Sequence, residues 1–269
     1  MQFTMHRPRG ALALFIDHLW CSWSPPRISV DGTQFPAGGV DLLFCLGPHQ
    51  GLVDVESGHI EWWNTSWVSG ERKHALHLRA PEGSHILGVH FRPGGAYPFF
   101  DLPLAELADR VVPLDVLWPG GEAIRHRLAA ATPATRFQVL EHELERRLAA
   151  NRMASGTAAV HTVARLETWG PGGSIRALAS DLGMSQRQLL RIFTDRVGLG
   201  PKGIHRVLRF QRLIRMLEPG GRPSWSRLAV GCGYFDQAHL IRDFRTFTGI
   251  TPTQYTALRS PDPNFAVAE

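Results

Sequence analysis

The chain has 269 residues, enough for two ordinary domains, and 43% of them are hydrophobic and 20% charged, which excludes a disordered chain. Residues 1–160 carry 14 Lys and Arg against 16 Asp and Glu, whereas residues 161–260 carry 15 against 6, a net charge of +9. This asymmetry indicates a polyanionic partner for the C-terminal part alone, with a merely solvated basic surface as the alternative.

The cysteines argue for a reducing compartment. Cys21, Cys45 and Cys232 are odd in number and widely spaced, which is untypical of a disulfide framework or a structural zinc site. No apolar run reaches the roughly 18 residues of a membrane helix, and the first ten residues lack the pattern of a signal peptide. We expect a cytoplasmic protein without a membrane partner.

The first hundred residues contain short apolar runs that Gly and Pro separate. These runs cover residues 40–46, 52–55, 74–79 and 85–91. Short strands at this spacing, with turn residues between them, predict a β-sandwich or a small barrel. A helix over residues 11–20 is expected to lead into it.

From Pro103 onward the apolar period becomes helical. The positions that fit a helix are Leu104, Leu107, Ala108, Val111, Ile124, Leu128, Phe137, Leu140, Leu144 and Leu148. We expect these helices to link two domains and to be candidates for packing against a second subunit. The predicted fold is α+β, with a β-rich domain over residues 1–150 and an all-α domain over 158–260. Residues 158–169 should form its first helix, and the tail from Pro261 should be disordered.

Two stretches of the C-terminal half repeat one pattern about fifty residues apart. An apolar helix, a glycine turn and a second capped helix occupy residues 175–201 and again residues 228–252. Gly183 corresponds to Gly233 at an offset of 50, whereas the following helix caps, Ser185 and Asp236, differ by 51. The repeat predicts two helix-turn-helix units, the second with a turn one residue longer, and each suited to a DNA major groove.

In the first unit, Ser174 can cap a helix with an apolar stripe, and Gly183 supplies the left-handed turn residue. Ser185 and Gln188 have the spacing of a capping box at the start of the recognition helix. The side chains that face outward on its first two turns are Arg187, Gln188 and Arg191. Arg and Gln have the shapes that bond best to guanine and adenine edges.

The second unit has the same plan. Ser224 or Ser226 begins its first helix, and Asp236 caps its recognition helix. The outward side chains there are Gln237, His239 and Arg242. One apolar stripe over residues 204–217 predicts a long helix that joins the units. Recognition helices in successive major grooves would lie roughly 34 Å apart.

Residues 161–260 resemble the C-terminal DNA-binding domain of AraC/XylS-type transcriptional regulators. The matching residues are Gly183-Met-Ser185, Leu189-Leu-Arg-Ile-Phe193, Gly198 and Pro201, then Gly233-Tyr-Phe-Asp236, Leu240-Ile-Arg-Asp-Phe244, Gly249-Ile-Thr-Pro252 and Tyr255. The resemblance implies a bacterial transcription factor that binds double-stranded operator DNA in two adjacent major grooves. An activator of this kind would also contact RNA polymerase, and a homodimer is a further expected assembly.

By this resemblance, base contacts fall on Arg187, Leu190, Arg191, Gln237, Ala238, His239 and Arg242. Leu190 and Ala238 depart from the family pattern because they offer only thymine-methyl contacts, and Thr256 replaces an Arg that is frequent after the family's tyrosine. Arg191 and Arg242 have alternatives as phosphate contacts or partners in local salt bridges. The arginines at positions 206, 209, 212 and 215 of the linking helix indicate a solvated or phosphate-facing surface.

The N-terminal half is similar to an uncharacterised sensor-like domain through residues 35–44 and 88–95. Such domains bind a small-molecule effector or mediate dimerisation. The tryptophans at positions 62, 63 and 67 are candidates for lining an effector pocket, with a place in the core as the alternative. No effector-binding residue can be assigned from the sequence.

The histidines and cysteines give no support to a metal, a cofactor or catalysis. His74 and His77 differ by an odd number, as do His85 and His90, so each pair points to opposite faces of its strand. No phosphate-binding glycine loop or nucleophile-base arrangement stands out, so we expect no enzyme. Two alternatives stay open: a DNA-associated enzyme with a reactive cysteine, and a sequence-independent DNA-binding protein.

Overall fold

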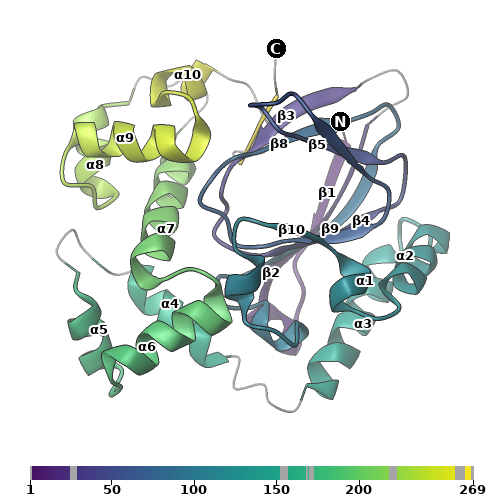
Figure 1. Cartoon of the computed structure of the whole chain (residues 1–269), viewed down its shortest axis with the longest axis horizontal. Helices are drawn as coiled ribbons and strands as arrows, with labels where there is room; N and C mark the ends of the chain where they lie inside the picture. The colour runs from purple at the N-terminus through teal and green to yellow at the C-terminus, as the bar shows by residue number, and fades with distance from the viewer. Residues whose placement is uncertain are drawn as a thin grey trace.

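The structure, a computed structural model, describes residues 2–24, 29–151, 157–167, 169, 173–217, 223–257 and 264–267. A β-rich N-terminal domain and a helical C-terminal domain lie side by side (Figure 1). The predicted α+β fold with two domains is confirmed. Among the described residues, no helix combines the length and the apolar character needed to cross a membrane.

The N-terminal domain contains two antiparallel sheets. The first sheet has the order β1 (Gln2–His6), β2 (Ile16–Trp23), β9 (His85–Phe91), β4 (Asp41–Cys45), β7 (Ser66–Ser69) and β10 (Val111–Pro113). The second has the order β11 (Phe265–Val267), β3 (Val30–Gln34), β8 (Leu76–Ala80), β5 (Gln50–Val53) and β6 (Ile60–Trp63). Each of the four apolar runs of the sequence therefore contains strand residues.

Alternate residues of the first sheet enter two different cores. Leu43 and Cys45 pack with Trp67 and, from the second sheet, with Trp63. Their neighbour Phe44 faces the opposite way, into a larger core that the helices α1 (Leu114–Leu117), α2 (Gly121–Ala130) and α3 (Arg136–Ala150) complete. The residues of α2 and α3 with no exposed surface in this core are Leu128, Leu140 and Leu144. The apolar stripes expected to join domains or subunits are thus used within the domain.

Residues 11–20 do not form the expected helix. The 3₁₀ helix η1 (Gly10–Leu14) is short, and β2 begins at Ile16. β2 pairs with β1 on one side and with β9 on the other, so that Leu19 lies opposite Val89. The two flanking strands supply hydrogen-bond partners for the backbone N–H and C=O groups of this segment. This pairing overrides the helical pattern of its sequence.

The C-terminal domain consists of short helices around one long helix. They are α4 (Thr157–Glu167), α5 (Ile175–Asp181), α6 (Gln186–Ile192), α7 (Pro201–Met216), α8 (Trp225–Gly231), α9 (Gln237–Thr248) and α10 (Pro252–Ala257). A π-helical turn, η4 (Phe193–Val197), extends α6. The pairs α5–α6 and α8–α9 lie at opposite ends of α7, as the linking-helix prediction required (Figure 1).

The end of the chain returns to the β domain. β11 pairs with β3, with Ala266 opposite Thr33, so the prediction of a disordered tail is wrong for residues 265–267. Residues 261–263 and 268–269 lie outside the described ones. An edge strand such as β3 leaves backbone groups unpaired, and Phe-Ala-Val includes strong strand formers that can bond to them.

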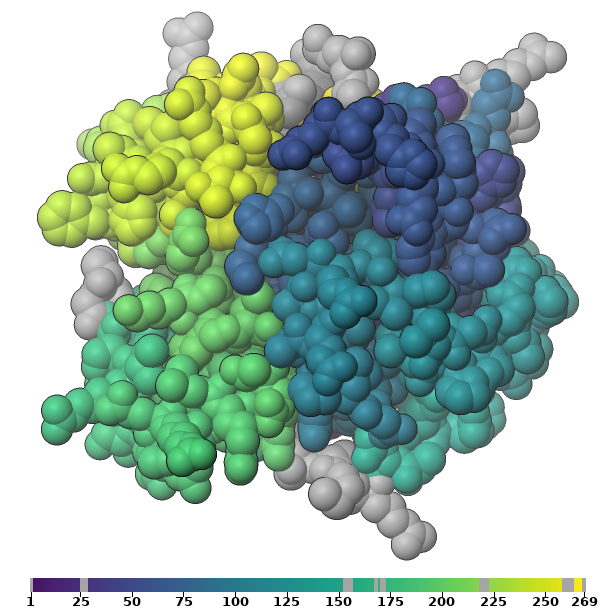
Figure 2. Space-filling view, viewed as in Figure 1, coloured from purple at the N-terminus to yellow at the C-terminus, as the bar shows by residue number. Residues whose placement is uncertain are grey.

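The two domains also share side-chain contacts. Both the green and the yellow parts of the C-terminal domain lie against the blue and teal β domain in Figure 2. Gln211 of α7 donates from Nε2 to the Pro36 carbonyl oxygen at 2.6 Å. Gly198, with φ of +98°, follows η4, and a Cβ there would lie 3.0 Å from the carbonyl oxygen of Leu104, in the 3₁₀ helix η3 (Leu104–Leu107). The close approach of the domains at this point therefore favours glycine.

Candidate nucleic-acid interface

The first helix-turn-helix unit has the caps and the turn that its sequence predicts. Ser174 Oγ accepts a hydrogen bond from the backbone N–H of Ala177 at 3.1 Å. Gly183 has φ of +63°, the left-handed conformation that ends α5. Leu178 and Leu189 are buried on the inner faces of α5 and α6, so the two helices pack as a unit.

A capping box at the start of α6 uses the side chain of Gln188. Ser185 Oγ accepts from the Gln188 N–H at 3.2 Å, and Gln188 Oε1 accepts from the Ser185 N–H at 2.9 Å. A bidentate contact with adenine needs both the oxygen and the nitrogen of a glutamine amide. Gln188 is therefore placed to hold the helix terminus, and only its amide nitrogen remains for a base.

The second unit repeats this geometry with one difference in its turn. Asp236 Oδ1 accepts from the His239 N–H at 2.7 Å, and Gly233 has φ of +83°. Four residues, 182–185, separate α5 from α6, whereas five residues, 232–236, separate α8 from α9. The extra residue in the second turn is confirmed. Ser224 is the N-cap of α8 without a side-chain cap bond.

Four of the six outward polar side chains predicted on the recognition helices are exposed and have no partner among the described residues. Arg187 and Arg191 on α6, and Gln237 and Arg242 on α9, form no side-chain hydrogen bond or ion pair with any residue that the structure describes. A guanidinium group without an internal partner keeps all five of its donors for a ligand. The alternative of local salt bridges for Arg191 and Arg242 has no support in this geometry.

His239, by contrast, faces the interior. Its Nε2 lies 3.2 Å from Nη2 of Arg209 and 3.7 Å from Oδ2 of Asp243, and its ring packs edge-on against Tyr234. The ring is about one-third exposed. These contacts assign His239 to the support of α9, and its prediction as a base contact gains nothing from the structure.

Arg209 corrects the prediction of an exposed arginine surface around the linking helix. It is 8% exposed, donates from Nη2 to Asp243 Oδ2 at 2.5 Å, and lies over the Tyr234 ring with its guanidinium carbon 4.3 Å from the ring centroid. Arg206 donates to Asp243 Oδ1 at 2.8 Å. The two arginines of α7 thus hold the second recognition helix through one buried carboxylate, which is 4% exposed.

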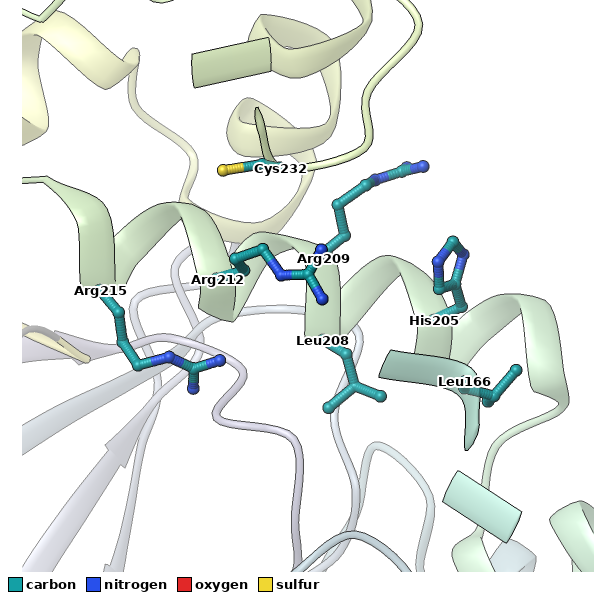
Figure 3. Close-up of a pocket in the computed structure, with 7 residues that line it drawn as sticks. All are labelled: Leu166, His205, Leu208, Arg209, Arg212, Arg215 and Cys232. Atoms are coloured by element: carbon teal, nitrogen blue, oxygen red, sulfur yellow. The ribbon is translucent and has the colours of Figure 1, made fainter. Parts of the chain in front are cut away.

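His205, Arg212 and Arg215 of α7 border a small pocket between this helix and the turn that carries Cys232 (Figure 3). Its volume is about 30 Å³, comparable to one water molecule. Burial and the nearby Arg209 lower the pKa of His205, so this histidine adds little charge at neutral pH. Arg215 is exposed. The pocket is thus small, and its border is basic.

Comparison with known families agrees with this architecture. Residues 178–257 match the family model described as a helix-turn-helix domain. This match agrees with the two helix-turn-helix units of the structure. Residues 4–113 match a domain of unknown function, DUF6597. The search of curated proteins gave no match.

Similar solved structures come from several bacteria. ToxT from Vibrio cholerae aligns over 95% of this chain and 98% of its own, with a TM-score of 0.50 and 8% identity. This likeness confirms the two-domain fold. A DNA-binding transcriptional dual regulator from Escherichia coli K-12 covers 36% of this chain and 83% of its own at 26% identity, with a TM-score of 0.31. A probable AraC family transcriptional regulator from Rhodopseudomonas palustris covers 35% and 88% at 25% identity, also with a TM-score of 0.31.

The tryptophans expected to line a pocket have other places. Trp67 is buried in the core between the sheets with its ring edge-on to Trp63, and Trp62 is 46% exposed.

His85 and His90 do point to opposite faces of β9: His90 Nδ1 lies 2.8 Å from Asp41 Oδ1, whereas His85 faces Arg136 of α3. Within the described part of the chain, no group of three His, Cys, Asp or Glu side chains could hold a metal ion.

Proposed function

We propose that this protein is a transcription regulator that binds one specific DNA site through α6 and α9 in successive major grooves. The observation that carries the proposal is the exposed, internally unpaired set of Arg187, Arg191, Gln237 and Arg242 on the two recognition helices. The net charge of +9 over residues 161–260 supplies the attraction to a polyanion. A sequence-independent binder would not require such side chains on both recognition helices.

The two helices are proposed to prefer different bases. Arg187 and Arg191 of α6 would bond to guanine edges, and Gln237 of α9 to adenine. Leu190 is 42% exposed and could meet only a thymine methyl group. Because the two sets of side chains differ, one chain should prefer an asymmetric site, whether or not it also dimerises.

The rival hypothesis of a DNA-associated enzyme gains no residue from the structure. Cys21 and Cys45 are buried, and burial raises the pKa of both thiols, which disfavours the reactive thiolate. We propose a cytoplasmic regulator, in keeping with a DNA partner and three free thiols. Homodimer formation is tested by the mass of the protein in solution, and contact with RNA polymerase by transcription in vitro from the selected site.

We expect Arg191→Ala and Arg242→Ala each to weaken binding to the preferred site by about 5- to 150-fold, because each removes a contact of about 1–3 kcal/mol with a base edge. Binding to random DNA of equal length should change far less. The measurement is selection of bound genomic fragments, followed by titration of each variant on the best site.

Arg215→Ala is the matched control, since Arg215 is exposed but lies on α7 rather than on a recognition helix. We expect it to weaken specific and random DNA alike and to reduce the slope of log affinity against log salt by about one if it contacts a phosphate. Equal losses on both DNAs for the recognition-helix variants would show that they contact phosphates, not bases. Unchanged specific binding would contradict the docking itself.

We also propose that a small molecule bound to the N-terminal domain controls DNA binding. The support is a cavity in this domain that is lined by residues of β1, β2, β9 and α3 and holds a buried arginine. Small-molecule sites are mostly apolar with a few fixed polar groups, and this cavity has that composition.

A further inference from the structure

A cavity of about 370 Å³ lies where the outer face of the first sheet meets the beginning of α3. Residues of β1, β2, β9 and α3 line it, among them Cys21, Ser24, His85, Leu87, Arg136 and Phe137. None of the described lining residues is acidic. The volume is within the range of small-molecule sites and more than ten times that of the pocket beside α7.

Arg136 is the charged group of this cavity. It is 9% exposed, and three of its N–H groups are fixed: Nε donates to the Leu128 carbonyl oxygen at 3.0 Å, Nη2 to that of Ala131 at 3.1 Å, and Nη1 to His85 Nε2 at 3.1 Å. Its guanidinium makes no ion pair with a carboxylate among the described residues. One N–H on each terminal nitrogen remains, because a guanidinium has five donors.

His85 cannot supply the missing negative charge, but it fixes the geometry. Arg136 can only donate, so Nε2 of His85 is the unprotonated nitrogen of a neutral ring. Burial and the charge of Arg136 lower the pKa of His85, which keeps it neutral at pH 7. The Cys21 sulfur lies 3.2 Å from the same nitrogen, and burial raises the pKa of this thiol. Arg136 is thus held rigidly while its charge stays without an anion.

The rest of the lining suits an apolar body. Leu87 and Phe137 form part of the walls, and Trp23 is 37% exposed on β2. Ser24 is 4% exposed, and its hydroxyl has no hydrogen-bond partner among the described residues. A buried polar group without a partner costs free energy, which a ligand atom could recover.

We propose that this cavity binds a small monocarboxylate with an apolar body, whose carboxylate accepts the two free N–H groups of Arg136. Such charge-assisted pairs are short and about twice as strong as neutral hydrogen bonds. The Ser24 hydroxyl is a further donor at the wall. A buried cation that meets an anion only in the bound state gives the site its preference for acids over neutral analogues.

A purely structural role for Arg136 would explain some of these contacts. Its bonds to Leu128 and Ala131 lie at the C-terminal end of α2, where a cation is favoured by the helix dipole. That role predicts that acids and neutral analogues bind equally, or not at all. Ligand discrimination by charge therefore separates the two roles.

Regulation through this cavity rests on the proposed function. α3 begins at Arg136 and ends at Ala150. Asn151, which follows the helix, donates from Nδ2 to the Pro98 carbonyl oxygen at 2.9 Å. The adjacent Tyr97 packs under Arg196, whose guanidinium carbon lies 5.2 Å from the ring centroid. Arg196 belongs to η4, which continues the recognition helix α6. A ligand that shifts the start of α3 thus acts on contacts that reach the DNA-binding unit.

The test measures binding of sodium octanoate and 1-naphthoate to the full chain by calorimetry, with 1-octanol and naphthalene as neutral analogues. We expect at least one acid to bind about tenfold or more tightly than its neutral analogue, as one charge-assisted hydrogen bond would give. Arg136→Gln should remove this preference. Thr4→Trp should block binding by filling the rim from an exposed position on β1. Arg146→Gln, an exposed arginine of the same helix, should bind normally.

Equal affinity for acids and neutral analogues, or no binding of either acid, overturns the proposal. Because Arg136→Gln can also disturb α2, retained acid binding in Thr4→Trp is an independent contradiction. Measured without DNA, octanoate binding bears on the cavity alone. If octanoate binds but leaves DNA affinity unchanged, the regulatory link is wrong and the cavity stands. If no specific DNA site exists, the proposed function fails while the calorimetry is unaffected.

Discussion

Asp243→Ala is expected to lower the free energy of unfolding of the C-terminal domain by about 3–5 kcal/mol. The carboxylate is 4% exposed and receives hydrogen bonds from Arg206 and Arg209, and Arg209 is itself 8% exposed. Removal of one partner from a buried ion pair leaves the other charge without compensation. Urea denaturation, followed by circular dichroism, measures the loss.

Two further variants show whether the loss comes from the unpaired charge. The double variant Asp243→Leu with Arg209→Met should recover most of the stability, because apolar replacement of a whole buried ion pair is often neutral or favourable. Glu122→Ala is the surface control, since Glu122 pairs with Arg125 while partly exposed, and such pairs contribute about 0–1 kcal/mol. Equal losses for Asp243→Ala and Glu122→Ala would contradict the buried pair.

The helix-turn-helix units were predictable because their determinants are local. A capping serine, a glycine with positive φ and an apolar stripe act within ten residues, and Ser174, Gly183 and Ser185 all have the predicted roles. The outward direction of Arg191 and Arg242 follows from the same periodicity. The recognition-helix surface therefore follows from the amino-acid sequence alone.

Other features of the structure depend on contacts between residues far apart in the sequence. The helical period of the sequence predicts that His239 and Arg209 lie on helix surfaces. In the structure Arg209 of α7 contacts both His239 and Asp243 of α9, so the three side chains form one cluster. β11 pairs with the edge of β3, more than 200 residues earlier in the chain. The cavity joins Cys21, His85 and Arg136 from three separate segments. No spacing rule within a single segment could indicate these groupings.

Glu71 marks the place where the β domain meets the end of the first recognition unit. Glu71 is 1% exposed, and a Cβ added to Gly198 would lie 3.5 Å from the Cβ of Glu71. Burial raises the pKa of Glu71 to about 8, and the Asp41 and Asp109 carboxylates act in the same direction against the opposing charge of His90. Asp41 in turn raises the pKa of His90, although burial opposes that protonation. Arg72 is the other charged neighbour of this group, through its backbone.

Glu71→Gln is therefore expected to remove a loss of stability that the native protein suffers as pH rises. The folded state holds the proton up to about pH 8, whereas the unfolded chain releases it near the ordinary glutamate pKa of 4.5, so stability falls between these values. From pH 6 to pH 9 the free energy of unfolding of the variant, relative to that of the native protein, should rise by about 2–3 kcal/mol. Urea denaturation of both proteins at both pH values measures the change. If the stability of both proteins depended on pH in the same way, Glu71 would be ionised in the folded state. The contact between the domains would then include a charged carboxylate instead of a neutral acid.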